Sequence, residues 1–557
     1  MRKAIGLACA IGFVAATVVA VPTVGAASRA ATATDTGTGT ATVTENPAAN
    51  AGSVAWGKCS DATLVKYKAQ CGVVRVPVDY SKPGGARVAL AVSRVRHTVS
   101  DSKFQGVMLV NPGGPGGSGL IYSILTNFVP NGAGASYDWI GFDPRGVGAS
   151  QDALSCIPNY FGYDRPNYVP TTKKLEQIWL DRSRSYSAAC ARKNNPALLR
   201  NLTTEDSARD MDSIRQALGQ SQINYYGFSY GTYLAQVYST LFPQRVRRMV
   251  LDSNVDPRGV WYQAQLDQDR AFDANMDVYF AWIAKYHAVF HLGTSGAAVK
   301  ALYYRTQAAL DVRAAGGIIG GDELNDVFLG AGYYIYDWVD IAQAFADYVH
   351  HGVWKPLKAL YDSASGIGDD NGFAVYLGVQ CTDAHWPQNY ATWRADSWRV
   401  YATAPFLTWN NTWFNAPCLT WPAPSGQPVK IDGSKVPPIL LLDETKDAAT
   451  PFEGSLEVRS LFPRSSLIAS PGGTTHAASL SGVSCVDDQV AGYLATGRLP
   501  ARKAGPGPDA LCAPLAPPVP KAAASAAAAT TVTADALATT ALRRLLVPTV
   551  AGRRAGA

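Results

Sequence analysis

A serine between two glycines is the first feature of this sequence that could do chemistry. The segment Gly-Phe-Ser-Tyr-Gly places Ser229 at the centre of a Gly-x-Ser-x-Gly pattern. An apolar strand is predicted over 223–226 and an amphipathic helix over 230–242, so the serine falls at a strand-to-helix turn. Such a turn raises the hydroxyl above the sheet edge, and Gly227 and Gly231 leave room for it because side chains there would collide with neighbouring elements. We therefore predict that Ser229 is a nucleophile.

A serine hydroxyl is a poor nucleophile at neutral pH, so it needs a base, usually a histidine, that a carboxylate orients. In enzymes with this kind of turn, the acid and then the histidine follow the serine along the chain. Of the seven histidines, His476 is the one that follows the late strands, and His385 is the alternative. For the acid we favour Asp447, in the loop after the apolar strand 436–443. Three other carboxylates stay open for this role: Asp252, Asp443 and Glu444.

A glycine-rich loop, Asn-Pro-Gly-Gly-Pro-Gly-Gly-Ser-Gly at 111–119, follows the apolar strand 106–110. It lacks the Lys-Ser/Thr ending of a P-loop and the Gly-x-Gly-x-x-Gly spacing of a dinucleotide-binding turn, which disfavours a phosphate-binding loop. Backbone N–H groups without side chains can approach a substrate oxygen closely. We predict an oxyanion hole built from the N–H of Tyr230 and one N–H of Gly113 or Gly114. The alternative is a purely structural loop.

The elements that must position these residues alternate between strands and helices. We expect strands at 71–78, 87–96, 106–110, 137–142, 223–226, 248–252, 436–443 and 466–468. Helical patterns are clearest at 202–218, 230–242 and 486–496. This alternation predicts an α/β fold with a mostly parallel central sheet and helices on both faces.

A long helical region rich in Trp and Tyr, at 259–430, interrupts this alternation. An all-helical insertion after the strand that follows the nucleophile helix is typical of a cap over an active site, with aromatic residues lining a substrate pocket. The alternative is that these aromatics pack the core of the cap itself. The sequence thus predicts a catalytic core in two parts, 52–258 and 431–512, and a low-complexity, mostly disordered tail at 513–557.

The N-terminus has the pattern of a secretory signal peptide over residues 1–26. Arg2 and Lys3 precede an apolar stretch at 4–20, and Val-Gly-Ala ends at Ala26 as a cleavage site. The alternative, an uncleaved membrane anchor, is disfavoured because the apolar run is short for a spanning helix. Residues 27–51 are rich in Ala, Thr and Gly, and we expect a disordered segment or a pro-segment there.

The cysteines and the charge fit an exported enzyme. One of the nine cysteines lies in the predicted signal peptide, which leaves an even number for an oxidising compartment. Nearest neighbours would close short loops, which predicts four pairs: Cys59–Cys71, Cys156–Cys190, Cys381–Cys418 and Cys485–Cys512. We expect no metal site or other cofactor. The net charge of +6 is spread without a dense Lys/Arg run, so a nucleic-acid partner is not expected.

Taken together, these motifs resemble the secreted bacterial tripeptidyl aminopeptidases, in the proline-iminopeptidase-like branch of the α/β-hydrolases. The resemblance spans about 56–512. It rests on the glycine-rich loop, Gly-Phe-Ser-Tyr-Gly-Thr, Val-Leu-Asp-Ser-Asn-Val-Asp-Pro, and Asp-x-x-Thr-Pro followed by His. It implies an α/β-hydrolase fold and an exopeptidase that releases short peptides, in this family tripeptides, from free N-termini. Ser229, Asp447 and His476 would be its catalytic triad.

The sequence departs from this family at two places. Relatives carry glycine on both sides of the catalytic histidine, where this chain has Thr475 and Ala477. The Asp-Gly that usually follows the strand after the nucleophile helix is Asp252-Ser253 here.

An exopeptidase must also hold the charged α-amino group of its substrate, which requires an acidic residue at a fixed distance from the nucleophile. Asp383 and Glu323, both in the predicted cap, are candidates. We expect a monomer that acts on peptides with a free N-terminus. One alternative is a secreted carboxylic-ester hydrolase with the same triad. Another is a binding protein on an inactive hydrolase scaffold, against which the intact Ser/Asp/His set argues.

Overall fold

The structure, a computed structural model, describes residues 53–524, all within one compact unit. The predicted signal peptide, the predicted segment at 27–51 and the tail beyond residue 524 lie outside the described residues. No helix within 53–524 is long and apolar enough to cross a membrane.

A ten-stranded sheet runs through the described part of the chain in the order β1-β2-β3-β5-β4-β6-β7-β8-β9-β10. Its strands are β1 (Gly57–Lys58), β2 (Gln70–Pro77), β3 (Arg87–Val95), β4 (Val107–Asn111), β5 (Asp138–Phe142), β6 (Ile223–Phe228), β7 (Val246–Asp252), β8 (Leu440–Glu444), β9 (Ser466–Ser470) and β10 (Ala510–Leu511). The first three pair antiparallel, β3 pairs antiparallel with β5, and every pair from β5 to β10 is parallel. The predicted mostly parallel sheet is confirmed.

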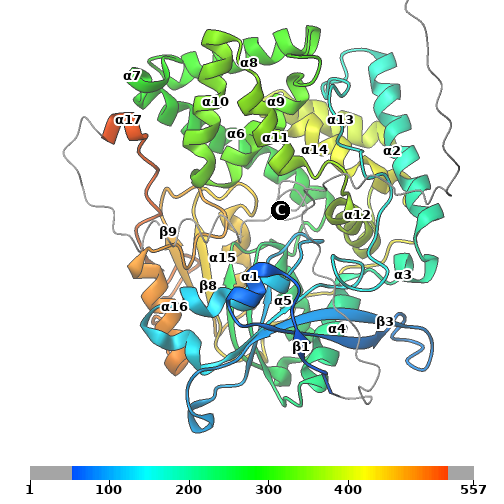
Figure 1. Ribbon diagram of the computed structural model, residues 1–557, viewed down its shortest axis with the longest axis vertical. Coiled ribbons are helices and arrows are strands. Elements are labelled where there is room, and N and C mark those ends of the chain that lie inside the picture. Colours follow the sequence, from blue (N-terminus) through cyan, green and yellow to red (C-terminus); the bar gives the residue numbers. More distant parts are fainter. Residues whose placement is uncertain (1–52, 525–557) are drawn as a thin grey trace, which may run out of the picture. The chain divides into compact units, whose positions relative to one another are not determined.

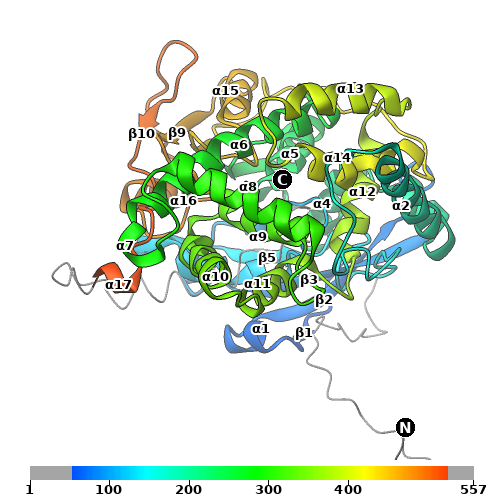
Figure 2. The same ribbon diagram turned by 90° about the horizontal axis from the view of Figure 1, so that it is seen from above.

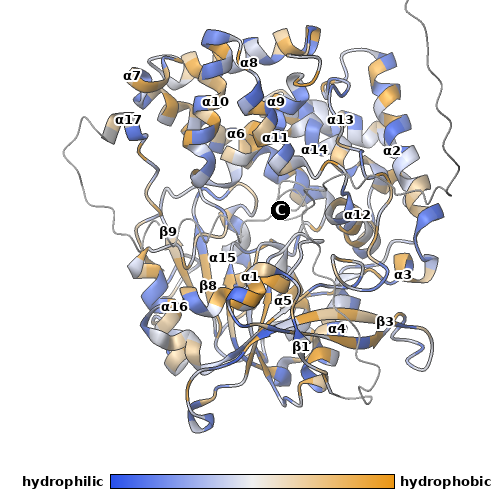
Figure 3. Ribbon diagram, viewed as in Figure 1, coloured by the Kyte–Doolittle hydropathy of each residue, from blue (hydrophilic) through white to orange (hydrophobic). Residues whose placement is uncertain are grey.

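Both faces of the sheet are buried along its central strands β4, β5, β6, β8 and β9, which are mostly apolar (Figure 3). Along β4, Leu109 joins the hydrophobic cluster on one face, and Met108 and Val110 join the cluster on the other. The first face packs against α4 (Thr204–Ala217), α5 (Tyr230–Leu241) and α15 (Phe452–Leu461). The second packs against η2 (Leu120–Phe128) and α16 (Ser484–Thr496). Short elements complete the core: α1 (Ala62–Lys66), η1 (Asp101–Lys103), η3 (Pro130–Ser136) and η4 (Pro243–Arg245).

A helical insertion separates β7 from β8, as predicted (Figures 1 and 2). Its elements are α6 (Tyr262–Lys285), α7 (His287–Phe290), α8 (Gly296–Val312), α9 (Gly321–Tyr333), η5 (Ile335–Asp337), α10 (Trp338–His351), α11 (Lys355–Ser365), α12 (Asn371–Asp383), α13 (Tyr390–Tyr401), α14 (Thr408–Asn415) and η6 (Ala416–Thr420). Many of its aromatic side chains pack a separate hydrophobic core of the insertion, as the second interpretation of these aromatics expected. We call this insertion the cap.

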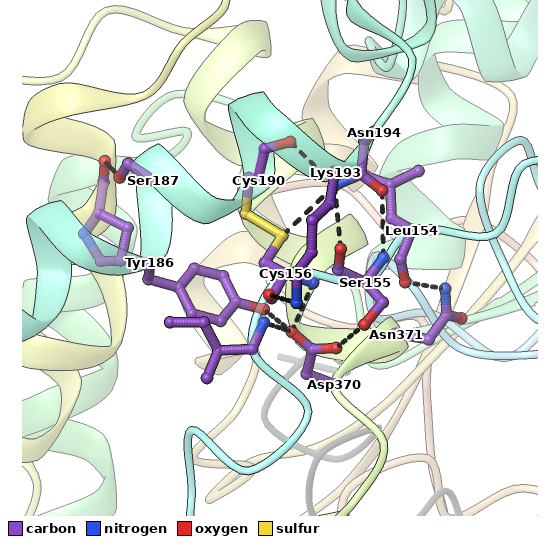
Figure 4. Close-up of a disulfide and its surroundings, with 12 residues drawn as sticks. Leu154, Ser155, Cys156, Tyr186, Ser187, Cys190, Lys193, Asn194, Asp370 and Asn371 are labelled. Carbon is purple, nitrogen blue, oxygen red and sulfur yellow. Dashed lines mark hydrogen bonds between the residues drawn. A yellow bond between two sulfur atoms is a disulfide. The ribbon is translucent and has the colours of Figure 1, made fainter.

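A second segment, between β5 and α4, adds helices to the cap. The sequence analysis did not predict this addition. The segment contains α2 (Lys173–Lys193) and α3 (Pro196–Arg200), and α2 packs against α14 and η6. Figure 4 shows how Asp370, just before α12, holds this segment. Its carboxylate accepts hydrogen bonds from Ser155 Oγ (2.7 Å), the Cys156 N–H (2.8 Å) and Tyr186 Oη (2.7 Å), beside the Cys156–Cys190 disulfide. The start of α12 is therefore fixed.

All four predicted cysteine pairs form disulfides in the structure. Residues 513–524, which the sequence analysis assigned to the low-complexity tail, make defined contacts. The Leu515 N–H donates to Glu444 Oε1 (3.0 Å), and Trp282 Nε1 donates to the Pro518 carbonyl (3.1 Å), ahead of the short helix α17 (Lys521–Ala524). This segment therefore connects the end of β8 to α6 of the cap.

Candidate active site

Ser229 lies at the predicted turn between β6 and α5. Its backbone has φ +57° and ψ −129°, a strained conformation that non-glycine residues seldom adopt and that is typical of a nucleophile at such a turn. Both flanking glycines are required. A Cβ on Gly227 would lie 2.7 Å from the Gly231 carbonyl oxygen, and one on Gly231 would lie 2.6 Å from the Asn111 carbonyl oxygen. Within residues 53–524, the buried Ser229 Oγ has no hydrogen-bond partner, which leaves it free for a reaction partner.

His476 and Asp447 are in direct contact. Nδ1 of His476 lies 2.7 Å from Asp447 Oδ2, and both side chains are buried. Asp447 Oδ1 accepts from the N–H groups of Ala449 (2.9 Å) and Thr450 (3.2 Å). Burial alone would raise the pKa of Asp447, but the charge and hydrogen bond of His476, with further donors, outweigh burial and hold that pKa below its ordinary value. Asp447 is therefore ionised at neutral pH and can orient the imidazole.

The end of β7 forms hydrogen bonds both to the loop that carries His476, which we call the histidine loop, and to the predicted nucleophile. The Ser229 N–H donates to the Asp252 carbonyl (3.0 Å), and the Ala477 N–H donates to Ser253 Oγ (2.8 Å). Asp252 Oδ2 also accepts from the Ser479 N–H (2.9 Å). Asp252 and Ser253 thus hold Ala477 and Ser479, which follow the predicted base, and the backbone of the predicted nucleophile.

These contacts explain one of the two departures from the family pattern, the serine at position 253. Ser253 has φ +65° and Ala477 has φ +54°, so both adopt a left-handed conformation that glycine adopts without cost. Ser253 compensates with a hydroxyl that accepts a hydrogen bond from the histidine loop. We find no comparable side-chain contact that explains Ala477.

The glycine-rich loop lies against the nucleophile. A Cβ on Gly113 would be 2.8 Å from Ser229 Cβ and 3.2 Å from the Tyr230 nitrogen. The Gly113 N–H, however, donates to Asn111 Oδ1 (2.9 Å), so it already has an acceptor within its own loop. Of the predicted oxyanion donors, this leaves the N–H groups of Gly114 and Tyr230.

The alternative candidates for the triad have other partners. Asp443 Oδ2 accepts from Ser455 Oγ, and Glu444 accepts from the N–H groups of Thr475 (2.5 Å) and Leu515. His385 is exposed and lies beside Ser425. The geometry therefore favours Asp447 and His476.

The two predicted anchors for a substrate amine are both committed to contacts within the fold. Asp383 accepts from the Thr204 N–H (2.6 Å) and from Trp261 Nε1 (3.3 Å). Glu323 is fully buried, accepts from the Gly320 N–H (2.8 Å) and pairs with Arg165 Nε (2.9 Å). Because their oxygens already have these partners, neither residue is carried forward as the anchor.

The cap contributes residues to the site that the sequence analysis missed. The His476 N–H donates to the Tyr333 carbonyl (2.9 Å), and the Tyr333 ring lies edge-on to the imidazole at 5.9 Å. Asn275 Nδ2 donates to the carbonyls of Lys446 and Thr474 (3.2 Å each). The abundance of aromatics in the cap was the one available signal, and it did not identify which residues face the core.

A cavity of about 570 Å³ lies beside the loop that carries Asp447. It is lined by Trp261 and Gln268 of the cap and by Thr450 and Pro451 of that loop, among others. Thr450 Oγ1 lies 3.5 Å from His476 Nδ1, so Thr450 separates the cavity from the predicted acid–base pair.

A serine at a strand-to-helix turn, followed by an aspartate–histidine contact after later parallel strands, is the arrangement of an α/β-hydrolase. Family models agree: one described as alpha/beta hydrolase fold matches residues 106–316, and one described as TAP-like protein matches 404–506. The chain is 39% identical to the tripeptidyl aminopeptidase of Streptomyces lividans over 85% of this chain and 89% of that protein. It belongs to the tripeptidyl aminopeptidase family of α/β-hydrolases, which confirms the predicted enzyme class, a serine peptidase.

The chain is also similar to more distant proteins. The serine protease Hip1 of Mycobacterium tuberculosis is 29% identical over 80% of this chain and 89% of its own. A carboxylesterase B of the same species is 30% identical over 80% of this chain and 88% of its own. Among solved structures, the proline iminopeptidase of Mycobacterium smegmatis covers 76% of this chain and 97% of its own, at 14% identity and a TM-score of 0.34.

Proposed function

We propose that this protein is a secreted serine exopeptidase that releases tripeptides from the free N-termini of peptides and proteins. The observation that carries the proposal is the buried contact of 2.7 Å between His476 and Asp447, together with the hydrogen bonds that join the loop of His476 and the backbone of Ser229 to the same strand end. Similarity to a tripeptidyl aminopeptidase over most of both chains supports the substrate class.

In this mechanism, Ser229 Oγ attacks the carbonyl of the third residue while His476 Nε2 takes its proton. Asp447, bound at Nδ1, holds the ring in the correct tautomer and stabilises the imidazolium. The N–H groups of Gly114 and Tyr230 stabilise the oxyanion, each contributing on the order of 3 kcal/mol. His476 then protonates the leaving amine, and water hydrolyses the acyl-enzyme to release the tripeptide.

Export is supported by the cysteine chemistry. Four disulfides within residues 53–524 require an oxidising compartment, which agrees with the signal peptide predicted at the N-terminus. Comparing the N-terminus of the protein recovered from the culture medium of a secreting host with residue 27 tests this part of the proposal. Retention of the whole chain inside the cell would contradict it.

The activity is tested with tripeptide p-nitroanilides that carry either a free or an acetylated N-terminus, and with shorter anilides of one or two residues. We expect cleavage of the free tripeptide substrate, loss of most activity on acetylation, and tripeptides as the products detected by mass spectrometry from longer peptides. Ser229→Ala is the inactive control. Because one relative is named a carboxylesterase, p-nitrophenyl acyl esters belong in the same experiment. Efficient turnover of simple esters with none of the tripeptide anilide would favour the esterase.

A further inference from the structure

One segment of α6 lies directly over the loops of the predicted triad. Gln268 Nε2 donates to the carbonyl of Ala449, two residues after Asp447 (2.6 Å), and Asn275 Nδ2 donates to the carbonyl of Thr474, two residues before His476 (3.2 Å). The segment between these contacts is two helical turns, about 10 Å long at 1.5 Å per residue. Side chains on the side of this segment that faces the core therefore lie close to the predicted triad.

The two sides of this segment have different surroundings. One side of α6 lines the cavity beside the loop that carries Asp447. The residues on this side include Ala264, Asp267, Gln268 and Ala271. Gln265 also lines this cavity, and Asp269 lies one turn further along α6, at helical spacing with Gln265 and Phe272.

The stripe that these three residues form contacts the inner helices of the cap. Gln265 Nε2 donates to Tyr376 Oη on α12 (3.1 Å), and the Phe272 ring packs against Tyr333, which contacts His476 (4.9 and 5.9 Å between ring centroids). The stripe therefore runs from α12, which starts against the glycine-rich loop, to the predicted base. Figure 2 shows α6, α12 and α14 gathered over α5.

Asp269 is a buried carboxylate without a cation. It is 2% exposed, and its Oδ1 accepts from Asn411 Nδ2 on α14 (3.0 Å). Within residues 53–524 this is the only hydrogen bond that the carboxylate accepts, and no Lys or Arg forms an ion pair with it. Burial therefore raises its pKa to about 7, although Arg270 opposes this on the same helix.

Several other buried carboxylates of the cap are compensated. Asp322 on α9 is an exception: its Oδ1 accepts the Tyr168 N–H (2.9 Å), its Oδ2 has no hydrogen-bond partner within residues 53–524, and the charge of Arg165 offsets only part of the cost of burial. Asp326 pairs with Arg165 (2.6 Å), and Asp273 pairs with Lys300 (3.2 Å). Asp383 has no cation but accepts hydrogen bonds from two residues. A carboxylate with one neutral amide donor is expensive to keep ionised in such an environment, unless a ligand supplies the missing positive charge.

We infer that Asp269 binds the α-ammonium group of the substrate's N-terminus, with Asn411 holding the carboxylate in place. This inference rests on the proposed function. An ammonium group supplies the charge that Asp269 lacks and donates to its second oxygen, which makes a strong charge-assisted hydrogen bond. α6 contacts the loops that carry Asp447 and His476, so an ammonium group held by Asp269 sets where the substrate must begin.

The test compares Asp269→Asn with Asp267→Asn, an exposed carboxylate two residues away on the cavity side. For each variant, kcat and KM are measured on the free and the acetylated tripeptide anilide. Losing the charged partner should raise KM for the free substrate about 10- to 100-fold, with a smaller change in kcat and little change for the acetylated substrate. Asp267→Asn should behave like the wild type on both substrates.

The outcomes separate the inference from the proposed function. If the wild type prefers the free substrate and Asp269→Asn keeps the same preference, the inference is wrong and the function stands. If the wild type cleaves both substrates equally well, the proposed function itself fails. Equal losses on both substrates would show that Asp269 has a structural role only.

Should Asp269→Asn fail to fold, the pH profile of the wild type is the second test. The titratable or charged groups around Asp269 are Tyr262, Asp267 and Arg270 on α6 and Tyr376 on α12, and α14 contributes the neutral Asn411. The ratio of kcat/KM between free and acetylated substrates should rise as Asp269 ionises near pH 7, then fall as the substrate amine loses its proton near about pH 8. A ratio that does not change between pH 5.5 and 7.5 would overturn the inference.

Discussion

Ser253 offers a test of how the histidine loop is held, because two opposing effects act at one residue. Its Oγ accepts the Ala477 N–H at 2.8 Å, next to the predicted base, while its backbone has a φ of +65°. Ser253→Ala removes the acceptor and keeps the unfavourable conformation. Ser253→Gly removes the same acceptor but relieves the conformation, and it restores the residue that the family pattern has at this position.

The sizes of the two effects predict the order of stability of the two variants. Loss of the acceptor for a buried N–H costs about 1–3 kcal/mol, and a left-handed conformation costs a non-glycine residue about 1–2 kcal/mol. We therefore expect Ser253→Ala to be destabilised by about 2 kcal/mol, and Ser253→Gly to recover about half of that loss. If half of this loss in stability is also lost from transition-state stabilisation, because His476 is held less well, kcat of Ser253→Ala falls about fivefold.

Urea unfolding and kcat on the free tripeptide anilide measure the two variants against the wild type. The expected order for both quantities is wild type, then Ser253→Gly, then Ser253→Ala. Wild-type behaviour of Ser253→Ala would show that the hydrogen bond to Ala477 contributes nothing. A Ser253→Gly variant less stable than Ser253→Ala would refute the assignment of strain to this backbone.

Three further predictions follow from the site. Asp447→Asn should lower kcat by about 10⁴-fold, because an amide favours the wrong imidazole tautomer, with KM nearly unchanged in steady-state assays. Gly113→Ala should lower kcat by at least about 100-fold, because its Cβ would lie 2.8 Å from Ser229 Cβ and the φ of +104° disfavours any side chain. A folded, fully active variant would contradict the proposed position of this loop. Burial raises the pKa of Glu444 to about 8, so the folded protein favours the protonated form. Its contribution to stability is complete at acidic pH and is lost as the pH rises toward 8. Glu444→Gln should therefore flatten the fall in unfolding free energy between pH 5 and pH 8, and an unchanged slope would show that other groups cause it.

Local patterns were enough to predict the core of this fold. The alternation of apolar strands with helices gave the parallel sheet, and the glycines around Ser229 gave the turn, since both depend on short-range sterics and periodicity. His476 and Asp447 were predicted from chain order, and the structure brings them into contact. These features lie within a few residues of a recognisable strand end.

Features that depend on contacts between distant segments were not predicted. Asp383 and Glu323 were chosen as amine anchors because they are acidic residues of the cap, but the sequence does not show that Thr204 and Arg165 already occupy them. Asp269 was not considered, because its distinguishing property is a missing cation, which only the packing of α6 against α12 and α14 reveals. Sequence identifies which groups can be charged, and the fold determines which of them lack a partner.

The contacts between cap and core have a consequence for how substrate enters. The backbone N–H of His476 donates to the Tyr333 carbonyl of the cap. Asn275 donates to the loop that carries Asp447 and to the loop that carries His476, and Gln268 donates to the Ala449 carbonyl. Each buried hydrogen bond contributes about 1 kcal/mol, and more if its partner is left unpaired. Lifting the cap as a rigid body would break all of them and would displace the predicted base. We therefore expect the cap to stay in place during turnover and the substrate to enter along it. If Asp269 binds the ammonium group of the substrate, such a wall accepts a chain end more readily than the middle of a chain, as the proposed exopeptidase activity requires.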